Sequence, residues 1–383
     1  MNKKIPIVLQ GYLASHVGFA EALRNYLFAI DKTGNYKIKV FPYDNDNIKL
    51  NLKKFVDTKI NERPIWIFHT GPTQMHPTCG YTIGIVVWEC MEWPQKFIEN
   101  FKKLDEIWVP AKFLKNGLER QGLTNVHFIP HPIDTERFNP AKIEPMKEML
   151  DPNLFRFYSV MGWSERKGVS DLLRAYIEEF STDDDTILYI KANHYSMMKA
   201  QTEVDAIRKK IKKKKQPYIV LDTRVYSYDE FPKLYKNADC FVLSSRGEGF
   251  GLNYVEAMSM ELPTIGTNAF SMPDFMNESN GYLINIKGFK LEPKCDWICD
   301  DYKGKKFPII DIEHLRFQMR KVFENRKEAK QKAKKARKDI IKYCSKEVIG
   351  QKLDKRLKEI WAGMKKYKLE ANLTKKDSIK YEN

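Results

Sequence analysis

The most constraining feature of this chain is a segment in which an apolar run, a glycine-rich turn and a helical stretch follow one another. Cys240–Leu243 is typical of a buried strand, and residues 252–260 favour a helix that ends before Pro263. Three glycines within residues 247–251 let the backbone approach a ligand closely. The helix start that follows offers unpaired N–H groups and a positive dipole end, which suit phosphate. The segment predicts an α/β unit with an anion site at its turn.

Two glutamates accompany this turn. Glu248 lies in the predicted loop, and Glu256 lies about one turn into the predicted helix. Carboxylates are poor ligands for phosphate, but they accept hydrogen bonds from sugar and ribose hydroxyls. A glycine-rich turn with a solvated glutamate is the simpler interpretation, and the spacing and the following segment 262–267 argue against it. The pattern therefore favours a site that binds sugar and phosphate together.

Residues 248–258 resemble the signature of the retaining glycosyltransferases of family 4, which have the GT-B fold. That signature is Glu-Gly-Phe-Gly followed by Glu-Ala-Met, with seven residues between the two glutamates, and the match here is nearly letter for letter. The resemblance covers most of the chain and is strongest at 108–281. It implies two Rossmann-like, doubly wound parallel-sheet domains that face a cleft. It also implies a UDP- or GDP-linked sugar as donor substrate and no further cofactor.

The order of predicted elements agrees with this architecture. A chain of 383 residues, 43% of them hydrophobic, suits two α/β domains. Apolar runs alternate with helical stretches, which predicts doubly wound sheets with ligands at the carboxyl ends of the strands. The predicted strands are 6–10, 37–42, 65–68, 81–88, 107–110 and 126–130, and then 155–161, 186–191, 218–221, 240–243, 264–266 and 281–284.

The domain boundaries follow from a segment without periodicity. Residues 131–153 contain four prolines and no clear pattern, so we place the linker at 141–153. The first, acceptor-side domain is then 1–140, and the second, nucleotide-sugar domain is 154–345. The resemblance implies that the last segment, 346–383, begins with a helix that crosses back to the first domain.

The resemblance also assigns donor-binding residues. The loop 162–168 resembles the phosphate loop of the family, which implies that Lys167 stabilises the departing diphosphate. Trp163 stands where the family often has arginine, so Arg166 is the expected replacement. Glu248 would contact sugar hydroxyls and Glu256 the ribose. The remaining predicted donor-binding residues are Gly162, Gly249, Phe250, Gly251 and Leu252, together with Arg224 and Val225 in the loop 223–227, which resembles the loop that meets the nucleobase.

On the acceptor side the candidates are His69 and Glu89, with the loop 11–18 and His76 as further possibilities. His69 ends a predicted strand at the cleft edge, where either a catalytic or a structural hydrogen-bonding role fits. Glu89 follows the predicted strand 81–88 at a place where many relatives carry a histidine. An ionised carboxylate cannot donate the hydrogen bond that a histidine would.

We predict no metal site. The aspartate clusters 44–46 and 183–185 imitate a metal-binding Asp-x-Asp motif, but both lie in polar connections and read as turns. The six cysteines are scattered, and Cys295 and Cys299 lack a second ligand pair at zinc spacing. We therefore expect free thiols and a reducing cytoplasm. No apolar stretch reaches the roughly 20 residues of a membrane span, and no signal peptide is expected.

The net charge of +16 bears on the acceptor. Lysine runs at 209–215 and 326–338 are either solvated helix faces in a lysine-rich protein or contacts for a polyanion. The polyanion would be an anionic membrane surface, with the protein bound peripherally, or a nucleic acid acceptor. The sequence alone does not separate these.

Three functions remain open at this point. The leading one is a metal-independent retaining glycosyltransferase, hexosyl- or pentosyl-transferring, that acts on a lipid-linked or surface glycan. The second is a viral or phage DNA-modifying glycosyltransferase that acts on a modified base. The third is a catalytically inactive glycan- or nucleotide-binding scaffold, which the departures at Trp163 and Glu89 favour and the intact Glu248 and Glu256 disfavour.

Overall fold

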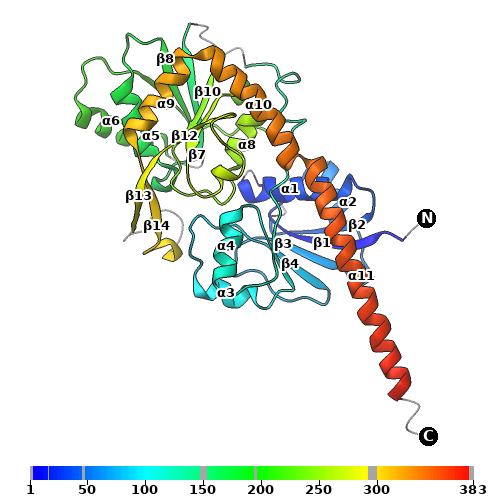
Figure 1. Ribbon diagram of the computed structural model, residues 1–383. Helices are drawn as coiled ribbons and strands as arrows, with labels where there is room; N and C mark the ends of the chain where they lie inside the picture. The colour runs from blue at the N-terminus through cyan, green and yellow to red at the C-terminus, as the bar shows by residue number, and fades with distance from the viewer. Residues whose placement is uncertain are drawn as a thin grey trace.

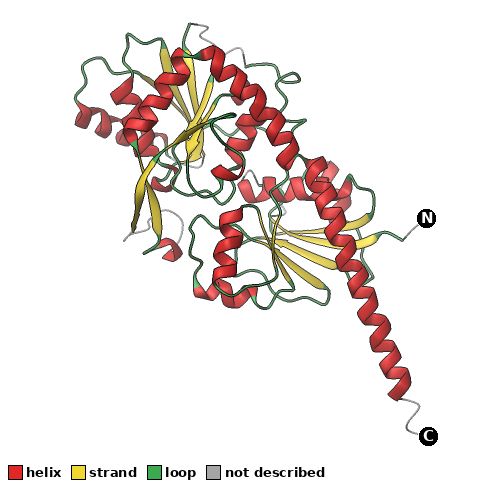
Figure 2. Ribbon diagram, viewed as in Figure 1, coloured by secondary structure: helices red, strands yellow, loops and turns green. Residues whose placement is uncertain are grey.

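The computed structural model describes residues 3–15, 17–44, 48–146, 153–193, 196–291 and 300–378. It contains two six-stranded parallel sheets, each with helices on both faces, and the two halves lie one above the other in Figure 1. Figure 2 shows the same arrangement by element type. The predicted fold class, two doubly wound parallel sheets, is confirmed.

The first sheet has the strand order β2-β1-β3-β4-β5-β6. β1, an interior strand of this sheet, is almost wholly buried, which explains why its sequence is a nearly continuous apolar run. The strands are β1 (Ile5–Gly11), β2 (Tyr36–Pro42), β3 (Ile65–His69), β4 (Tyr81–Ile85), β5 (Glu106–Val109) and β6 (Val126–Phe128), and the helices are α1 (Gly18–Asp31), α2 (Leu50–Val56), α3 (Gln95–Phe101) and α4 (Lys112–Arg120).

The predicted strand 81–88 is too long. β4 ends at Ile85, and residues 86–88 are irregular although they are apolar. Trp88 packs in a cluster with Trp93 and Phe97, and its indole nitrogen donates to the carbonyl of Glu92. Packing under the loops, rather than strand pairing, buries these residues, so Glu89 lies in a loop and does not end a strand.

The second sheet has the order β12-β11-β10-β7-β8-β9. The predicted strand 155–161 corresponds to β7, which pairs with β8 over eight residues. The strands are β7 (Phe155–Gly162), β8 (Thr186–Asn193), β9 (Tyr218–Asp222), β10 (Cys240–Leu243), β11 (Thr264–Thr267) and β12 (Tyr282–Ile284), and the helices are α5 (Val169–Glu179), α6 (Met197–Ile211), α7 (Phe231–Lys236), α8 (Leu252–Ser259), α9 (Ile312–Glu324) and α10 (Arg326–Cys344).

The chain crosses between the halves twice. The first crossing runs from β6 to β7, and it contains the predicted linker 141–153, of which 147–152 lie outside the described residues. The second leads from α10 into α11 (Lys346–Ser378), which packs on α1 of the first half. A side chain at Gly350 would come within 2.7 Å of the carbonyl of Ala29, so glycine permits this close packing. α11 thus leads from the second half onto the first.

One further element was not predicted. β13 (Ile286–Leu291) and β14 (Lys306–Ile310) form an antiparallel pair that extends from the second half toward α3 and α4 of the first (Figure 1). β13 is mostly exposed and carries no alternating apolar pattern, so its sequence gives little signal. The connection between the two strands includes Cys295 and Cys299, which lie outside the described residues.

The cysteines and the hydropathy of the helices bear on disulfides and membrane spans. Cys79, Cys90, Cys240 and Cys344 are thiols rather than members of disulfides. None of the helices in the described ranges combines the length and the apolar character that crossing a bilayer requires.

Candidate active site

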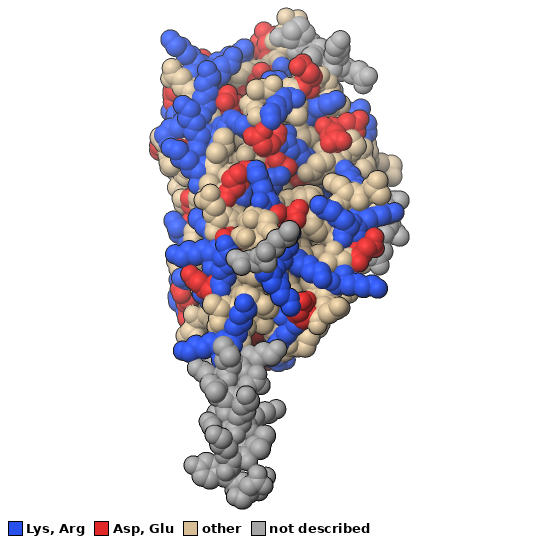
Figure 3. Space-filling view, turned by 90° about the vertical axis from the view of Figure 1, so that its right-hand side faces the viewer, with Lys and Arg blue, Asp and Glu red and all other residues tan. Residues whose placement is uncertain are grey.

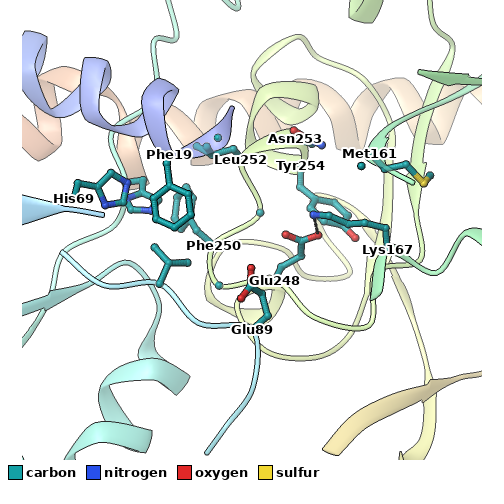
Figure 4. Close-up of a pocket in the computed structure, with 16 residues that line it drawn as sticks. Phe19, His69, Glu89, Met161, Lys167, Glu248, Phe250, Leu252, Asn253 and Tyr254 are labelled. Atoms are coloured by element: carbon teal, nitrogen blue, oxygen red, sulfur yellow. Dashed lines mark hydrogen bonds and ion pairs between the residues drawn. The ribbon is translucent and has the colours of Figure 1, made fainter. Parts of the chain in front are cut away.

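A cavity of about 250 Å³ lies between the two halves, where the carboxyl ends of both sheets meet. Such an edge is where open parallel sheets bind their ligands. The first half contributes Gly18, Phe19, His69, Val87, Glu89 and His131 to its walls, and the second half contributes Met161, Gly162, Lys167 and residues 248–254 (Figure 4).

Two loops of the second half bring Lys167 and Glu248 together. Lys167 ends a 3-10 turn, Glu165–Lys167, after β7, and Glu248 follows β10. Gly168 allows the loops to pack, because it has a φ of 69° and a side chain there would come within 2.0 Å of the carbonyl of Ser244. The Lys167 ammonium donates to Oε1 of Glu248 at 2.6 Å, as the dashed line in Figure 4 marks.

This pair is charged and largely buried. The side chains of Lys167 and Glu248 are 14% and 13% exposed. Burial alone would raise the pKa of Glu248, but the charges of Lys167 and Arg166 outweigh it and hold that pKa below its usual value. The cavity therefore contains a cation that suits a phosphate and an ionised carboxylate that suits sugar hydroxyls.

Arg166 lies elsewhere than the resemblance implied. The residue is only 7% exposed, and within the described ranges it is not one of the residues that line the cavity. Its guanidinium donates to the carbonyl of Gly247 at 2.6 Å and approaches Oε1 of Glu89 to 3.5 Å. Arg166 thus supports the glycine loop from behind.

The glycines of residues 247–251 allow close contact between the two halves as well as close approach of a ligand. A side chain at Gly249 would come within 2.1 Å of Cγ1 of Val87, and one at Gly247 within 2.8 Å of the carbonyl of Glu89. Gly251 begins α8 in the left-handed region, with a φ of 91°. The α8 N-terminus therefore faces the cavity on a loop that only glycine allows.

A second cavity of about 140 Å³ adjoins the first, and the two share Gly18, Leu252 and Asn253. Glu256 lines it together with Arg224 and Val225 from the loop after β9. The predicted ribose residue and the predicted nucleobase loop are therefore brought together.

Glu256 is buried, and its carboxylate is only partly engaged. Its side chain is 4% exposed, and its Oε2 accepts a hydrogen bond from the Tyr235 hydroxyl at 2.7 Å. Burial, with a further contribution from the charge of Glu21, raises the pKa of Glu256 to about 8. Near neutral pH the carboxyl is mostly protonated.

His69 lies at the end of β3 and reaches the cavity from the first half. Its Nδ1 is 3.3 Å from the carbonyl of Ile85, and its Nε2 has no partner within the described part of the chain. Burial lowers the pKa of His69 to about 4, so the imidazole is neutral. A buried polar atom without a partner is unusual in proteins, and a bound ligand would satisfy it. His76, by contrast, is exposed and lies outside the cavity walls.

Sequence reasoning did not single out Asn253, Arg137 or Lys191, which also line these cavities. Asn253 lies inside the signature and could have been found from its position after Gly251. Arg137 lies before the predicted linker in a stretch without periodicity. Its guanidinium forms an ion pair with Glu21 at 2.7 Å and stacks on the ring of Tyr228. These contacts join segments that are distant in the sequence, so no local sequence pattern predicts them.

The two aspartate clusters have other partners. Asp44 accepts hydrogen bonds from the backbone of residues 13–15, and the rest of that cluster lies outside the described residues. Asp183 pairs with Lys215, and Asp184 pairs with Arg320. In the ranges that the structure covers, no three His, Cys, Asp or Glu side chains gather as a metal site would require.

Comparison with known proteins adds independent information. A family model described as glycosyl transferases group 1 matches residues 153–290. Mannosylfructose-phosphate synthase from Agrobacterium fabrum is 26% identical over 156 residues, which are 39% of this chain and 34% of that protein. The match thus spans about a third of the length of that curated relative.

Solved structures match over nearly the whole chain. Sucrose-phosphate synthase from Thermosynechococcus elongatus superposes with a TM-score of 0.69 at 14% identity, covering 94% of this chain and 100% of that one. The HepE protein of Anabaena, in complex with UDP-glucose, superposes with a TM-score of 0.67 at 12% identity, covering 93% and 100%.

Residues 153–290 match the group 1 glycosyltransferases, and nearly the whole chain has the GT-B fold of these solved structures. The segment that the family model matches contains Lys167, Glu248 and Glu256, so the residues that line the second-half walls of both cavities belong to this glycosyltransferase region. The family match over residues 153–290 and the shared fold agree with the resemblance drawn from the signature.

Proposed function

We propose that this protein is a retaining glycosyltransferase that transfers a sugar from a nucleoside-diphosphate sugar to a glycan or glycolipid acceptor. The observation that carries the proposal is the Lys167–Glu248 pair in the cavity between the two halves, beside the cavity that holds Glu256. The HepE complex with UDP-glucose supports a UDP-linked donor as the first to test.

In this proposal each group has one task. Lys167 and the N-terminus of α8 stabilise the negative charge that develops on the diphosphate. Glu248 accepts hydrogen bonds from the sugar hydroxyls, and the amides of residues 249–251 donate hydrogen bonds to the sugar. Glu256 accepts hydrogen bonds from the ribose. The bond from the anomeric carbon to the diphosphate breaks, and the acceptor oxygen bonds that carbon from the same face. The acceptor proton passes to the departing phosphate oxygen.

A donor panel tests the proposal. UDP- and GDP-linked sugars are added in turn, and the melting temperature is measured. A donor present at 100 times its Kd stabilises the folded state by about 2.7 kcal/mol. If no sugar nucleotide shifts the melting temperature, the proposal fails. With a productive donor, NMR of the product decides between retention and inversion, and we propose that a chelator leaves the rate unchanged.

The pKa of Glu256 leads to a prediction about donor binding. An ionised carboxylate accepts hydrogen bonds from ribose more strongly than a protonated one. Because the free protein holds Glu256 mostly protonated below about pH 8, donor binding should release a proton. Donor affinity should therefore rise by up to about tenfold per pH unit between pH 6 and 8 and level off above. Calorimetry over this range measures it, and Glu256→Gln should flatten the profile. A flat profile in the wild-type protein would contradict the assignment.

The basic runs differ in their contacts. In the run 209–215, Lys213 donates to three backbone carbonyls at the end of α5, and Lys215 pairs with Asp183. On α10, by contrast, five exposed lysines follow one another at helical spacing; they are Lys327, Lys330, Lys334, Lys338 and Lys342. A sixth exposed lysine of this helix, Lys335, pairs with Asp339. From the right-hand side of Figure 1, Lys and Arg side chains cover more of the surface than Asp and Glu do (Figure 3).

We infer that the α10 lysines attract an anionic acceptor, and we favour a glycolipid in an anionic membrane surface. Replacing the five with glutamine should raise the acceptor KM and flatten its dependence on salt, because each lysine near an anionic surface contributes about 1 kcal/mol of screened attraction. Donor hydrolysis without acceptor should not change. Replacing Lys209, Lys210 and Lys214 is the control. Unchanged acceptor kinetics would show that the α10 lysines do not contact the acceptor. Binding that depends steeply on salt with duplex DNA, and not with vesicles, would favour a nucleic acid acceptor.

A further inference from the structure

The unpredicted hairpin β13–β14 makes an apolar contact with the acceptor half beside the active site. Tyr302, in a short 3-10 turn before β14, stacks on Trp88 with ring centroids 4.3 Å apart and planes within 5° of parallel. Tyr302 and Phe307 belong to the same buried cluster as Trp88, Trp93 and Phe97. The hairpin is thus packed into the first half as part of its core.

The Tyr302 hydroxyl does more than pack. It donates a hydrogen bond to Oε2 of Glu89, and Oε1 of the same carboxylate lies 3.5 Å from the Arg166 guanidinium. One carboxylate of the first half is therefore held by two groups from separate segments of the second half. Glu89 also lines the active-site cavity.

The position of Glu89 bears on the catalytic loops. Arg166 is buried, and a buried charge is costly unless an opposite charge or hydrogen bonds compensate it. Its guanidinium supports the carbonyl of Gly247, and its own carbonyl accepts from the amide of Arg246 at 2.7 Å. The next residue is Lys167. A shift of Glu89 would thus be transmitted through Arg166 to both loops that bring Lys167 and Glu248 together.

We propose that Tyr302 is a positioning residue that holds Glu89 against Arg166, so that the hairpin β13–β14 links closure of the two halves to the placement of Lys167 and Glu248. A carboxylate at residue 89 then has a structural reason, since Glu89 is engaged between Tyr302 and Arg166. The inference rests on the proposed function for its effect on turnover, but its structural part can be measured without a substrate.

Two variants separate positioning from simple docking. Tyr302→Phe keeps the ring on Trp88 and removes only the hydroxyl. Asp301→Asn, one residue earlier, removes an ion pair with Lys96, at 2.6 Å, that ties the hairpin to α3 at the exposed rim. If the hairpin only packs on the first half, both variants weaken that packing to a similar extent. If Tyr302 positions Glu89, only Tyr302→Phe affects the loops that carry Lys167 and Glu248.

The experiment measures turnover, donor Kd and hydrogen exchange in the peptide that spans residues 86–93. For Tyr302→Phe we expect a fall in kcat of about 10- to 100-fold, the effect of losing one hydrogen bond to a charged group. The donor Kd should change little, and exchange in residues 86–93 should be faster. Asp301→Asn should behave like the wild-type protein in all three.

Other outcomes are decisive as well. Unchanged kcat and unchanged exchange in folded Tyr302→Phe, or equal losses in both variants, would overturn the proposal. If Tyr302→Phe does not fold, Glu89→Gln is measured in its place. In that variant the amide oxygen still accepts a hydrogen bond from Tyr302, but the charge that faces Arg166 is lost. Unchanged kcat and unchanged hydrogen exchange in Glu89→Gln would also overturn the proposal. If the wild-type protein turns over no sugar nucleotide, the proposed function fails, and the exchange measurement alone decides on Tyr302.

Discussion

Lys167→Met is expected to lower turnover about 100- to 1000-fold. Loss of one group that stabilises the charge developing in the transition state has an effect of this size. Lys167 is the cation nearest to Glu248, at 2.6 Å, and its side chain faces the cavity (Figure 4). Methionine keeps much of the volume and removes the charge. Single-turnover kinetics at saturating donor measure the effect on the chemical step.

A matched variant separates this effect from loss of stability. Lys167→Met leaves the buried Glu248 without its nearest cation, which destabilises the fold, although Arg166 still contributes. The double variant Lys167→Met with Glu248→Gln removes both charges and should recover most of the melting temperature. Its turnover should stay low. Near-normal turnover in either variant would show that the phosphate site lies elsewhere.

The second large effect is expected for Gly249→Ala, which should lower turnover about 100-fold or more. The added methyl group would lie 2.1 Å from Cγ1 of Val87 and 3.0 Å from the carbonyl of Trp88, both in the other half of the molecule. The two halves would have to move apart, and a displacement of about 1 Å at a reacting centre costs about 100-fold in rate. The melting temperature should change far less than activity.

Two controls accompany this prediction. Gly363→Ala, on α11, adds a methyl group into open space and should leave turnover unchanged. Val87→Ala combined with Gly249→Ala removes the closer of the two clashes and should restore part of the activity. Normal turnover in Gly249→Ala would mean that the observed contact between the halves does not form during catalysis.

Much of the fold could be predicted, because apolar runs in parallel sheets are strong local signals. The predicted strand 240–243 coincides with β10, and 65–68 differs from β3 by one residue. The strand 81–88 was predicted too long, since the burial of residues 86–88 comes from aromatic packing with Trp93 and Phe97. The hairpin β13–β14 was missed because its first strand is exposed.

The candidate site, like the fold, could be predicted where the signal is local and not where it depends on contacts between distant segments. Glu248, Gly249, Gly251 and Glu256 could be predicted as site residues because they lie in one local sequence pattern. The structure brings Lys167 to Glu248 from 81 residues away in the sequence. The placement of Arg166 behind the cavity wall, and its approach to Glu89, depend on contacts between distant segments that no local pattern encodes.

The central claim is that the Lys167–Glu248 pair is the place where a nucleoside diphosphate leaves a sugar. The most direct measurement is the release of nucleoside diphosphate from the panel of sugar nucleotides, followed by NMR for the wild-type protein and for Lys167→Met. We predict that at least one donor is cleaved by the wild-type protein and that Lys167→Met cleaves it at least about 100-fold more slowly. Equal release by the two proteins, or none from any donor by the wild-type protein with an acceptor present, would contradict the account.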